Sequence, residues 1–236
     1  MVRSRGLDGG ALKCIAAALM LIDHVGAILL PEVPVLRCVG RLAFPLFAFC
    51  IAEGYAHTRD FWGYFRRLAV FAVVSEVPFN LENGVFFDPA RQNVLFTFCL
   101  ALLTLRGLDV LRRERDFGRY AGCTAVLAAG FAAGELLRVD YGGWGVLTVA
   151  LFYLCRDGKF AKLGLFLAMA VVNGLGMGSL TVPIFGWEAP IQIFAVLALP
   201  VIWLYNGRAG AKGLRWAFYV FYPAHLLVLE GIRALI

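Results

Sequence analysis

The segment ALKCIAAALMLIDHVGAILL occupies residues 11–30. It matches the roughly 20 largely apolar residues that an α-helix needs to cross the hydrocarbon core of a membrane. Asp23 and His24 nevertheless lie side by side well inside it. Ionisable side chains are costly in hydrocarbon, and those within membrane helices usually face an interior cavity or a partner. The segment therefore predicts a transmembrane helix that carries part of a functional site.

The composition of the whole chain is that of an integral membrane protein. Its 236 residues are 61% apolar and 16% charged, and their mean hydropathy is +0.78. Soluble domains typically contain about 45–50% apolar and about 25% charged residues. No stretch of the chain is polar enough to form a soluble domain. Residues 1–236 are therefore expected to form a single membrane domain.

Apolar runs of helical length recur along the chain. We predict an all-α fold, a polytopic transmembrane helix bundle of about nine spans. The third and sixth runs are short, so the expected range is eight to ten. The candidate spans are residues 11–31, 39–57, 65–80, 91–108, 119–138, 143–156, 160–178, 188–205 and 214–234.

The basic residues alternate between the two sides of this predicted bundle. If every span crosses and the N-terminus is cytoplasmic, the cytoplasmic segments hold 17 of the 22 Lys and Arg residues. Cytoplasmic loops of membrane proteins are enriched in these residues. The pattern predicts a cytoplasmic N-terminus and a C-terminus outside. It also assigns the net charge of +6 to membrane orientation, and no nucleic-acid partner is expected.

The six cysteines form no recognisable chemical motif. No two of them have CxxC spacing, and most fall inside apolar runs. Buried, unreactive cysteine is the common behaviour of such residues. We expect neither a disulfide framework nor a metal site.

One group of polar side chains is predicted near the outer face. A helix rises about 1.5 Å per residue, which places His24 in the outer third of the first span. Neighbouring residues of a helix do not face each other, so Asp23 cannot orient His24 from its own helix. Arg41, at similar depth on the second span, is the candidate partner of Asp23. The outer group is Asp23, His24, Arg41, Glu76, Asn80, Arg91, Asn93 and His225.

A second polar group is predicted at the cytoplasmic ends of the second and third spans. Glu53 and His57 are four residues apart, share a helix face and can pair. Guanidinium groups grip phosphates well, so the arginines of this group suit a phosphorylated substrate. The inner group is Glu53, His57, Arg59, Arg66 and Arg67.

The two groups together suit a reaction with substrates on both sides of the membrane. His24 can act as a general base, because the unperturbed pKa of histidine, about 6.5, lies close to operating pH. Proton-coupled transport uses the same residue types. Structural interpretations are also open: ion pairs for Asp23 and Glu53, a core position for His225, and membrane anchors for Arg66 and Arg67. The residues alone leave transferase and transporter undecided.

Several blocks of the sequence resemble, in order and nearly from end to end, those of the TraX family. TraX of conjugative plasmids acetylates the N-terminal amine of pilin in the inner membrane. The resemblance therefore implies a bacterial cytoplasmic (inner) membrane protein. The blocks are LKCIAAALMLIDHVG, RLAFPLFAFCIAEGYAHTRD, YFRRLAVFAVVSEVPFNL, QNVLFTFCLALL, DYGGWGVL, IQIFAVLALPVIWLYNGRAG and WAFYVFYPAHLL.

The family also resembles, more distantly, the acyltransferase-3 family of polysaccharide O-acetylases and the lysosomal heparan N-acetyltransferase group. In the acyltransferase-3 family the first helix ends in a histidine essential for transfer, and His24 falls at that place. An arginine-rich stretch after the second helix serves the acyl-CoA there, and Arg66 and Arg67 fall at that place. The arginine that this wider family has near the start of the first helix is Lys13 here.

The resemblance implies acetyl transfer from cytoplasmic acetyl-CoA to an amine or hydroxyl at the outer face. The acceptor would be a pilin-type peptide N-terminus or a cell-envelope sugar, and no metal is required. His24 would remove the proton of the acceptor, and Asp23, with Arg41 as its partner, would be a structural or orienting group. Asn93, Tyr222 or His225 would stabilise the oxyanion. His57, Arg59, Arg66 and Arg67, with Glu53, would hold acetyl-CoA, and the acceptor site would contain Glu76, Asn80, Arg91 and Tyr222.

Two rival functions remain open beside this one. A proton-coupled transporter or permease would typically contain inverted repeats, which the sequence does not display. A non-enzymatic assembly partner of a conjugation or secretion system would leave the neighbouring Asp23 and His24 without a use. The oligomeric state and the identity of the acceptor are not indicated by the sequence.

Overall fold

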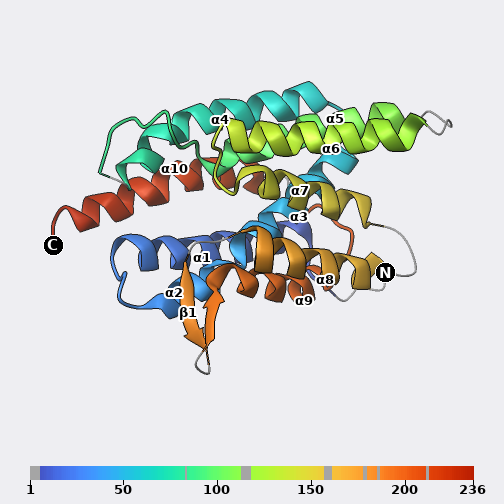
Figure 1. Cartoon of the computed structure of the whole chain (residues 1–236). Coiled ribbons are helices and arrows are strands. Elements are labelled where there is room, and N and C mark those ends of the chain that lie inside the picture. Colours follow the sequence, from blue (N-terminus) through green and yellow to red (C-terminus); the bar gives the residue numbers. More distant parts are fainter. Residues whose placement is uncertain are drawn as a thin grey trace.

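The computed structural model describes residues 6–82, 84–112, 118–156, 161–177, 180–184, 187–210 and 213–236. It is a bundle of helices with one small hairpin (Figure 1). Parts of the predicted cytoplasmic segments, residues 1–5, 113–117, 157–160 and 211–212, lie outside the described residues. The helices are α1 (Gly9–Ile28), α2 (Pro34–Gly40), α3 (Ala43–His57), α4 (Phe61–Leu81), α5 (Val94–Arg112), α6 (Gly118–Leu136), α7 (Gly142–Leu154), α8 (Ala161–Val171), α9 (Ala198–Ile202) and α10 (Leu214–Arg233).

Local sequence signals explain where several helices begin. The Asp8 carboxylate accepts a hydrogen bond from the Ala11 amide at 2.8 Å and caps α1. Asp60 caps α4 in the same way through the Gly63 amide. Such caps satisfy amides that have no partner inside the helix. Pro34 occupies the first turn of α2, where its missing N–H costs nothing.

The helices pack in three groups. Figure 1 shows α4, α5 and α6 on one side of the bundle, α1, α2, α8 and α9 on the other, and α3, α7 and α10 between them. Helix α1 contacts α2, α3 and α10, and α5 contacts α4, α6 and α7. The core between them is apolar, and Leu12, Leu46 and Leu102 are fully buried. The C-terminal ends of α1 and α2 and the middle of α10 are thereby brought close to the α6–α7 connection.

The predicted helical segments are largely confirmed, whereas the number of spans and their orientation stay predictions. Among the described residues, three helical stretches are long and apolar enough to cross a membrane, judged by length and composition. They are Gly9–Ile28, Pro34–His57 and Val94–Leu111, and the second consists of α2 and α3. Shorter apolar helices are Gly142–Leu154, Ala161–Gly176 and Ile191–Ile202.

The prediction of one continuous helix over residues 188–205 is wrong. This stretch begins as strand β2 (Trp187–Pro190), continues as a 3₁₀-helix (Ile191–Leu197) and ends as α9. Proline has no N–H to donate, so Pro190 and Pro200 interrupt the backbone pattern of an α-helix. The predicted span 160–178 is also altered, because α8 passes into a π-helical turn (Val172–Gly176).

An antiparallel hairpin was not expected. Strand β1 (Thr181–Ile184) pairs with β2, and Thr181 lies opposite Pro190. The hairpin projects from the helical bundle below α1 and α2 in Figure 1. Leu180 and Ile191, which flank it, reach back to line the candidate site.

Helices α1 and α2 approach so closely that glycine is required between them. A Cβ atom added at Gly40 would lie 2.6 Å from the Cα atom of Asp23, and one at Gly26 would lie 2.7 Å from the Leu36 Cβ. Neither neighbour is the far end of a flexible side chain. The closeness of these helices therefore fixes the position of Asp23.

We expect Gly40→Ala to lower the free energy of unfolding by about 1–3 kcal/mol, because the added methyl group overpacks a rigid contact. Thermal unfolding in lipid nanodiscs measures the effect. Gly164→Ala on α8 is the matched control, since a Cβ there meets nothing within 4 Å. Equal unfolding temperatures for the two variants would show that α1 and α2 separate without cost.

Candidate functional site

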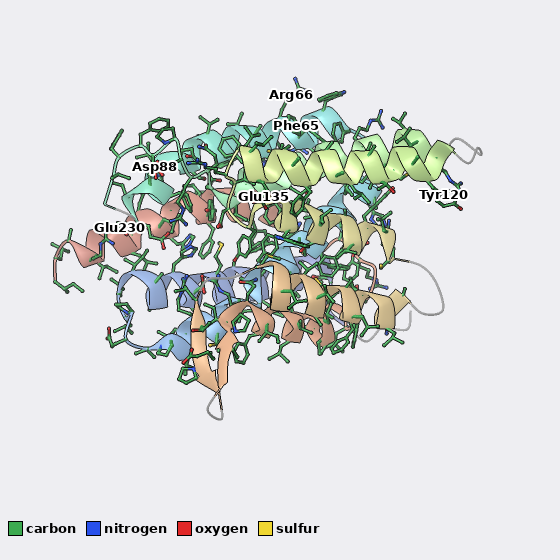
Figure 2. The ribbon with its side chains drawn as sticks, viewed as in Figure 1. Phe65, Arg66, Asp88, Tyr120, Glu135 and Glu230 are labelled. Atoms are coloured by element: carbon green, nitrogen blue, oxygen red, sulfur yellow. The ribbon has the colours of Figure 1, made fainter. Side chains whose placement is uncertain are left out.

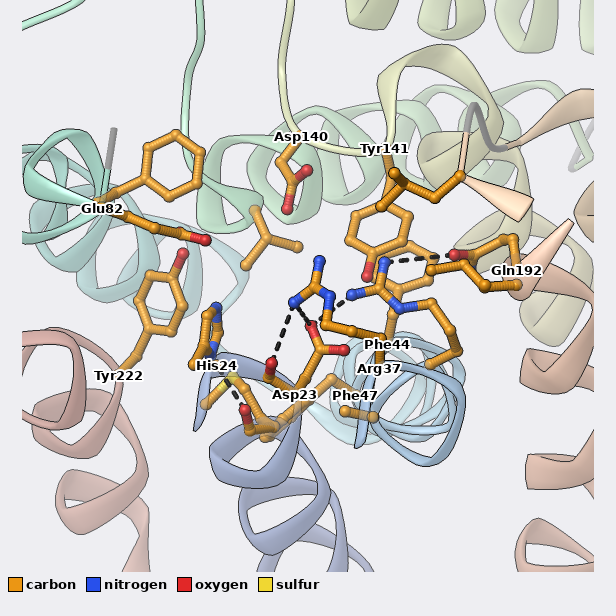
Figure 3. Close-up of a pocket in the computed structure, with 18 of the residues that line it drawn as sticks. Asp23, His24, Arg37, Phe44, Phe47, Glu82, Asp140, Tyr141, Gln192 and Tyr222 are labelled. Atoms are coloured by element: carbon orange, nitrogen blue, oxygen red, sulfur yellow. Dashed lines mark hydrogen bonds and ion pairs between the residues drawn. The ribbon is translucent and has the colours of Figure 1, made fainter. Parts of the chain in front are cut away.

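A polar cavity of about 260 Å³ lies where α1, α2, α3, α10 and the α6–α7 connection meet (Figure 3). Apolar residues of α3 and α5 form part of its wall, and most of the ionisable side chains come from helix ends. Its charged and polar lining residues are Asp23, His24, Arg37, Arg41, Glu82, Arg91, Asp140, Tyr141, Gln192 and Tyr222.

Asp23 binds two arginines at the floor of the cavity. Arg37 donates to the Asp23 carboxylate at 2.9 Å and to its backbone carbonyl at 3.0 Å. Arg41 forms an ion pair with the same carboxylate oxygen. The predicted pairing of Asp23 with Arg41 is confirmed, and Arg37 is an additional partner. Arg37 and Arg41 are four residues apart, a spacing that places both on one helix face.

The Arg41 guanidinium also connects the cavity to a second layer of buried polar residues. It lies 3.5 Å from the Gln192 side-chain oxygen, and Gln192 donates to Asn173 at 3.2 Å. Asn173 is fully buried in the π-helical turn and donates to the Met169 carbonyl. This series of hydrogen bonds orients the guanidinium group of Arg41 from the side opposite Asp23.

His24 is held by a different set of contacts from Asp23. Its Nδ1 atom lies 3.0 Å from the Met20 carbonyl oxygen and 3.0 Å from Nε2 of His225. The ring of His24 faces the same opening as Tyr222, Glu82 and Asp140 in Figure 3. The prediction that Asp23 does not orient His24 is therefore confirmed, since Asp23 is bound to the two arginines.

Two carboxylates of the opposite wall were not predicted. Glu82 follows α4, and Asp140 lies in the connection between α6 and α7. Burial raises the pKa of Asp140, and nearby Arg41 and Arg91 oppose that rise. Burial also raises the pKa of Glu82, and Arg37 is the main opposing influence. Together with Asp23, Glu82 and Asp140 bring the number of carboxyl groups in the cavity to three, equal to the number of arginines. The lining is therefore polar without a large excess of acidic or basic groups.

A second cavity, of about 280 Å³, lies toward the predicted cytoplasmic side. Its basic side chains are those of Lys13, Arg67 and His57, and the rest of the lining is mainly aromatic and aliphatic. The buried Nε atom of Arg67 has no hydrogen-bond partner in the described part of the chain. A buried donor without a partner is costly, so this atom is available to an anionic ligand.

The two cavities meet at two phenylalanines. Phe47 of α3 and Phe98 of α5 belong to the lining of both. Phe98 in turn stacks on Phe44, whose ring stacks on Tyr141 at a centroid distance of 3.8 Å. The two cavities are therefore neighbours, and these aromatic side chains lie between Lys13 and Arg67 on one side and His24 on the other.

The sequence profile of the TraX protein family matches residues 8–233. This range covers nearly all of the chain, from the start of α1 to the end of α10. The chain belongs to the TraX family.

Named relatives agree with this membership. The TraX-family chain is 32% identical to the probable fimbrial assembly protein FimC, serogroup H1, of Dichelobacter nodosus, over 96% of each chain. It is 28% identical to the protein TraX of Escherichia coli, over 95% of this chain and 86% of that one. No solved structure matches.

The fold of this TraX-family protein brings only part of the predicted outer group to the cavity. Asp23, His24, Arg41, Arg91 and the predicted acceptor residue Tyr222 line it, and His225 contacts His24 from behind. Glu76, Asn80 and Asn93 form a separate buried cluster, in which Glu76 accepts from both asparagines. Asn93 also donates to the Ala72 carbonyl at 2.8 Å, so this cluster joins α4 to the start of α5.

The predicted inner group is also divided. His57 and Arg67 line the second cavity, whereas Arg59 and Arg66 are exposed, and Arg66 points away from the bundle in Figure 2. The predicted pairing of Glu53 with His57 is confirmed at 3.6 Å, and Arg156 binds Glu53 more closely, at 3.0 Å. Lys13 also lines the second cavity, a position that was not predicted from its place on the first helix.

Within the described ranges, no group of three His, Cys, Asp or Glu side chains is placed to hold a metal ion. The ionisable and polar side chains that line the TraX-family cavity are one histidine, carboxylates, arginines, tyrosines and a glutamine. The geometry can accept a proton at His24 and hold an anionic group at the second cavity.

Proposed function

We propose that this TraX-family protein is a membrane-embedded acetyltransferase, which moves an acetyl group from cytoplasmic acetyl-CoA to an amine or hydroxyl at the outer face. The observation that carries the proposal is the pair of cavities that share Phe47 and Phe98. One offers a base and the other offers cations. Two separate substrates that must meet at one reacting bond suit this arrangement.

Acetyl-CoA would bind with its phosphates at the second cavity. Arg67 and Lys13 supply positive charge there, and His57 stands at the rim with 60% of its side chain exposed. Arginine is well suited to phosphate because its fork of donors matches the phosphate oxygens. The exposed Arg59 and Arg66 would attract the nucleotide from solution. The narrow pantetheine arm would then pass Phe47 and Phe98 toward His24.

The transfer follows from the position of His24. As the acceptor nitrogen or oxygen attacks the thioester carbon, its proton moves to Nε2 of His24. The bond between the acceptor atom and the acetyl carbon forms, and the carbon–sulfur bond breaks. The CoA thiolate then receives the proton from His24. The products are the acetylated acceptor and CoA. The Tyr222 hydroxyl, which lines the same cavity, is the proposed donor to the oxyanion.

The relatives guide the choice of acceptor. The name of the Dichelobacter relative refers to fimbrial assembly, and the resemblance to TraX implies pilin as an acceptor. We therefore propose a pilin-type peptide N-terminus, with a cell-envelope sugar as the alternative, and a location in the bacterial cytoplasmic membrane. The N-terminus would face the cytoplasm.

The relative's name also favours a second candidate, a non-enzymatic role in pilus or fimbrial assembly. This role would require neither the His24 base nor the cationic second cavity. It predicts association with pilin without consumption of acetyl-CoA, which separates it from the first proposal.

The test is acetyl-CoA turnover by the protein purified into lipid. With labelled acetyl-CoA and cell-envelope extract, we expect release of free CoA and label transferred to an acceptor. Arg67→Ala should raise the acetyl-CoA concentration for half-maximal rate by about tenfold or more, since a charge-assisted contact contributes about 1.5–3 kcal/mol. Arg208→Ala, an exposed arginine outside both cavities, is the control.

Absence of both binding and turnover would overturn the acetyltransferase proposal. Association with pilin in that case would favour the assembly role. Substrate flux across the lipid without release of CoA would favour a transporter.

A further inference from the structure

We infer that His225 is a positioning residue for His24, which fixes the tautomer of His24 so that its Nε2 atom is the base facing the cavity. The catalytic part of this inference rests on the proposed acetyltransferase function. The hydrogen bonds that carry it do not, because they are made between residues of the chain itself.

The protonation of each ring nitrogen follows from its neighbours. Nδ1 of His225 lies 2.8 Å from the Phe221 carbonyl oxygen, which can only accept, so this nitrogen carries the proton. In a neutral imidazole the other nitrogen is then an acceptor. Nε2 of His225 is therefore a lone pair directed at Nδ1 of His24, 3.0 Å away.

The same reasoning assigns the protons of His24. Its Nδ1 atom lies between two acceptors, the Met20 carbonyl oxygen and Nε2 of His225, each at 3.0 Å. Nδ1 must therefore be the protonated nitrogen. Nε2 of the neutral ring is left with its lone pair, and no hydrogen bond to it is formed within the described part of the chain. This is the form that a general base requires.

The packing around His225 keeps its ring in this orientation. The residue is 5% exposed, and Phe221 stacks on it at a centroid distance of 4.8 Å and an angle of 8°. Tyr222 contacts it from a second direction. His24 and His225 lie on α1 and α10, so the contact joins the first and last helices of the fold.

His225 accepts the hydrogen bond from Nδ1 of His24, a role that a carboxylate often has toward a catalytic histidine. The carboxylate of Asp23, the neighbour of His24 in the sequence, is bound to Arg37 and Arg41. A neutral acceptor stabilises the charged His24 through its Nδ1–H bond during transfer. It adds no negative charge to a cavity that must also accept an oxyanion.

The test begins with a nitrogen spectrum of the resting protein, for which no substrate is needed. The chain has three histidines, so labelling them with ¹⁵N gives six ring nitrogens. In lipid at neutral pH, we expect the Nδ1–H tautomer at both His24 and His225. We also expect magnetisation transfer between Nδ1 of His24 and Nε2 of His225. The Nε2–H tautomer at His24 would overturn the inference.

Substitutions then test the role in turnover. We expect His225→Phe to lower kcat by about 10- to 100-fold, a part of the contribution of a general base. The acetyl-CoA concentration for half-maximal rate should not change. His225→Gln is the matched rescue, since its amide oxygen can accept a hydrogen bond from Nδ1 of His24. Its kcat should exceed that of His225→Phe by about tenfold or more. Thermal unfolding of each variant monitors the packing of α10.

The outcomes separate this inference from the proposed function. Full kcat in a folded His225→Phe protein would remove the positioning role and leave the acetyltransferase intact. Equal losses in His225→Phe and His225→Gln would assign His225 to packing. A wild-type protein without acetyl transfer, but with the expected nitrogen spectrum, would overturn the function and retain the hydrogen bond that fixes the tautomer.

Discussion

Acetyl transfer is expected to fall by about 10²- to 10⁴-fold in the His24→Ala variant, the range that a positioned general base contributes. His24 lines the polar cavity, and its Nδ1 atom is occupied by Met20 and His225. His24 is the one histidine among the described residues that line this cavity, so the alanine variant has no imidazole there to take the proton of the acceptor. Release of CoA from labelled acetyl-CoA in lipid measures the loss.

Two further variants serve as comparisons for His24→Ala. His24→Gln keeps a side chain that can donate to His225 but takes up no proton, so it should be as inactive as the alanine variant. Leu21→Ala on the same helix, at a partly exposed position, should retain the wild-type rate. The second cavity is unaltered in all three, and binding of acetyl-CoA should persist. More than a tenth of the wild-type rate in His24→Gln would assign the proton transfer to another group.

Periodicity and depth predicted much of the fold and the first contacts of the site. Hydropathy located the helices because burial in lipid requires long apolar runs. Asp23 and Arg41 were matched because an unpaired charge at that depth is costly, and the ion pair between them is present. The spacing of Glu53 and His57 predicted their pairing for a similarly local reason.

Depth along a helix does not indicate the direction in which a side chain points. Glu76 and Asn93 were predicted to belong to the outer group, yet they bind each other between α4 and α5 and do not line the cavity. Glu82 and Asp140 reach it because a helix end and a connection fold inward. The His24–His225 contact joins residues 201 positions apart, and two lone histidines give no signal of such pairing.

The β1–β2 hairpin was not predicted from the sequence, for a different reason. Averages over the length of a span combine an apolar hairpin with the helix that follows it, and both are hydrophobic. The β-branched and aromatic residues of TVPI and WEAP, with a proline in each, were the available signal. Its neighbours Leu180 and Ile191 form part of the cavity wall, so the missed element contributes to the site.

The second large effect is expected for Asp23→Ala, which should lower the free energy of unfolding by about 3–5 kcal/mol, as is typical when one partner of a buried ion pair is removed. Asp23 is 7% exposed, and it is the carboxylate bound to both Arg37 and Arg41. Without it, two neighbouring guanidinium groups repel each other at the floor of the cavity. Unfolding in mixed micelles measures the loss.

The size of this loss depends on what Arg41 retains. Its remaining side-chain hydrogen bond, to Gln192, is long at 3.5 Å, and its buried Nε atom has no partner in the described part of the chain. Arg37 is better placed, since 22% of its side chain is exposed. The uncompensated charge of Arg41 should therefore account for most of the effect.

A double substitution separates charge from packing. Asp23→Leu combined with Arg41→Met removes both charges and keeps apolar volume, and replacing a buried ion pair in this way is often neutral. We expect this variant to be more stable than Asp23→Ala, although it should lose acetyl transfer. Glu230→Ala is the control for an ordinary pair, because Arg233 is 38% exposed and also donates to the Leu81 and Glu82 carbonyls. Its cost should stay below about 1 kcal/mol. An Asp23→Ala protein as stable as Glu230→Ala would show that water reaches Arg41 and that the cavity floor is not sealed.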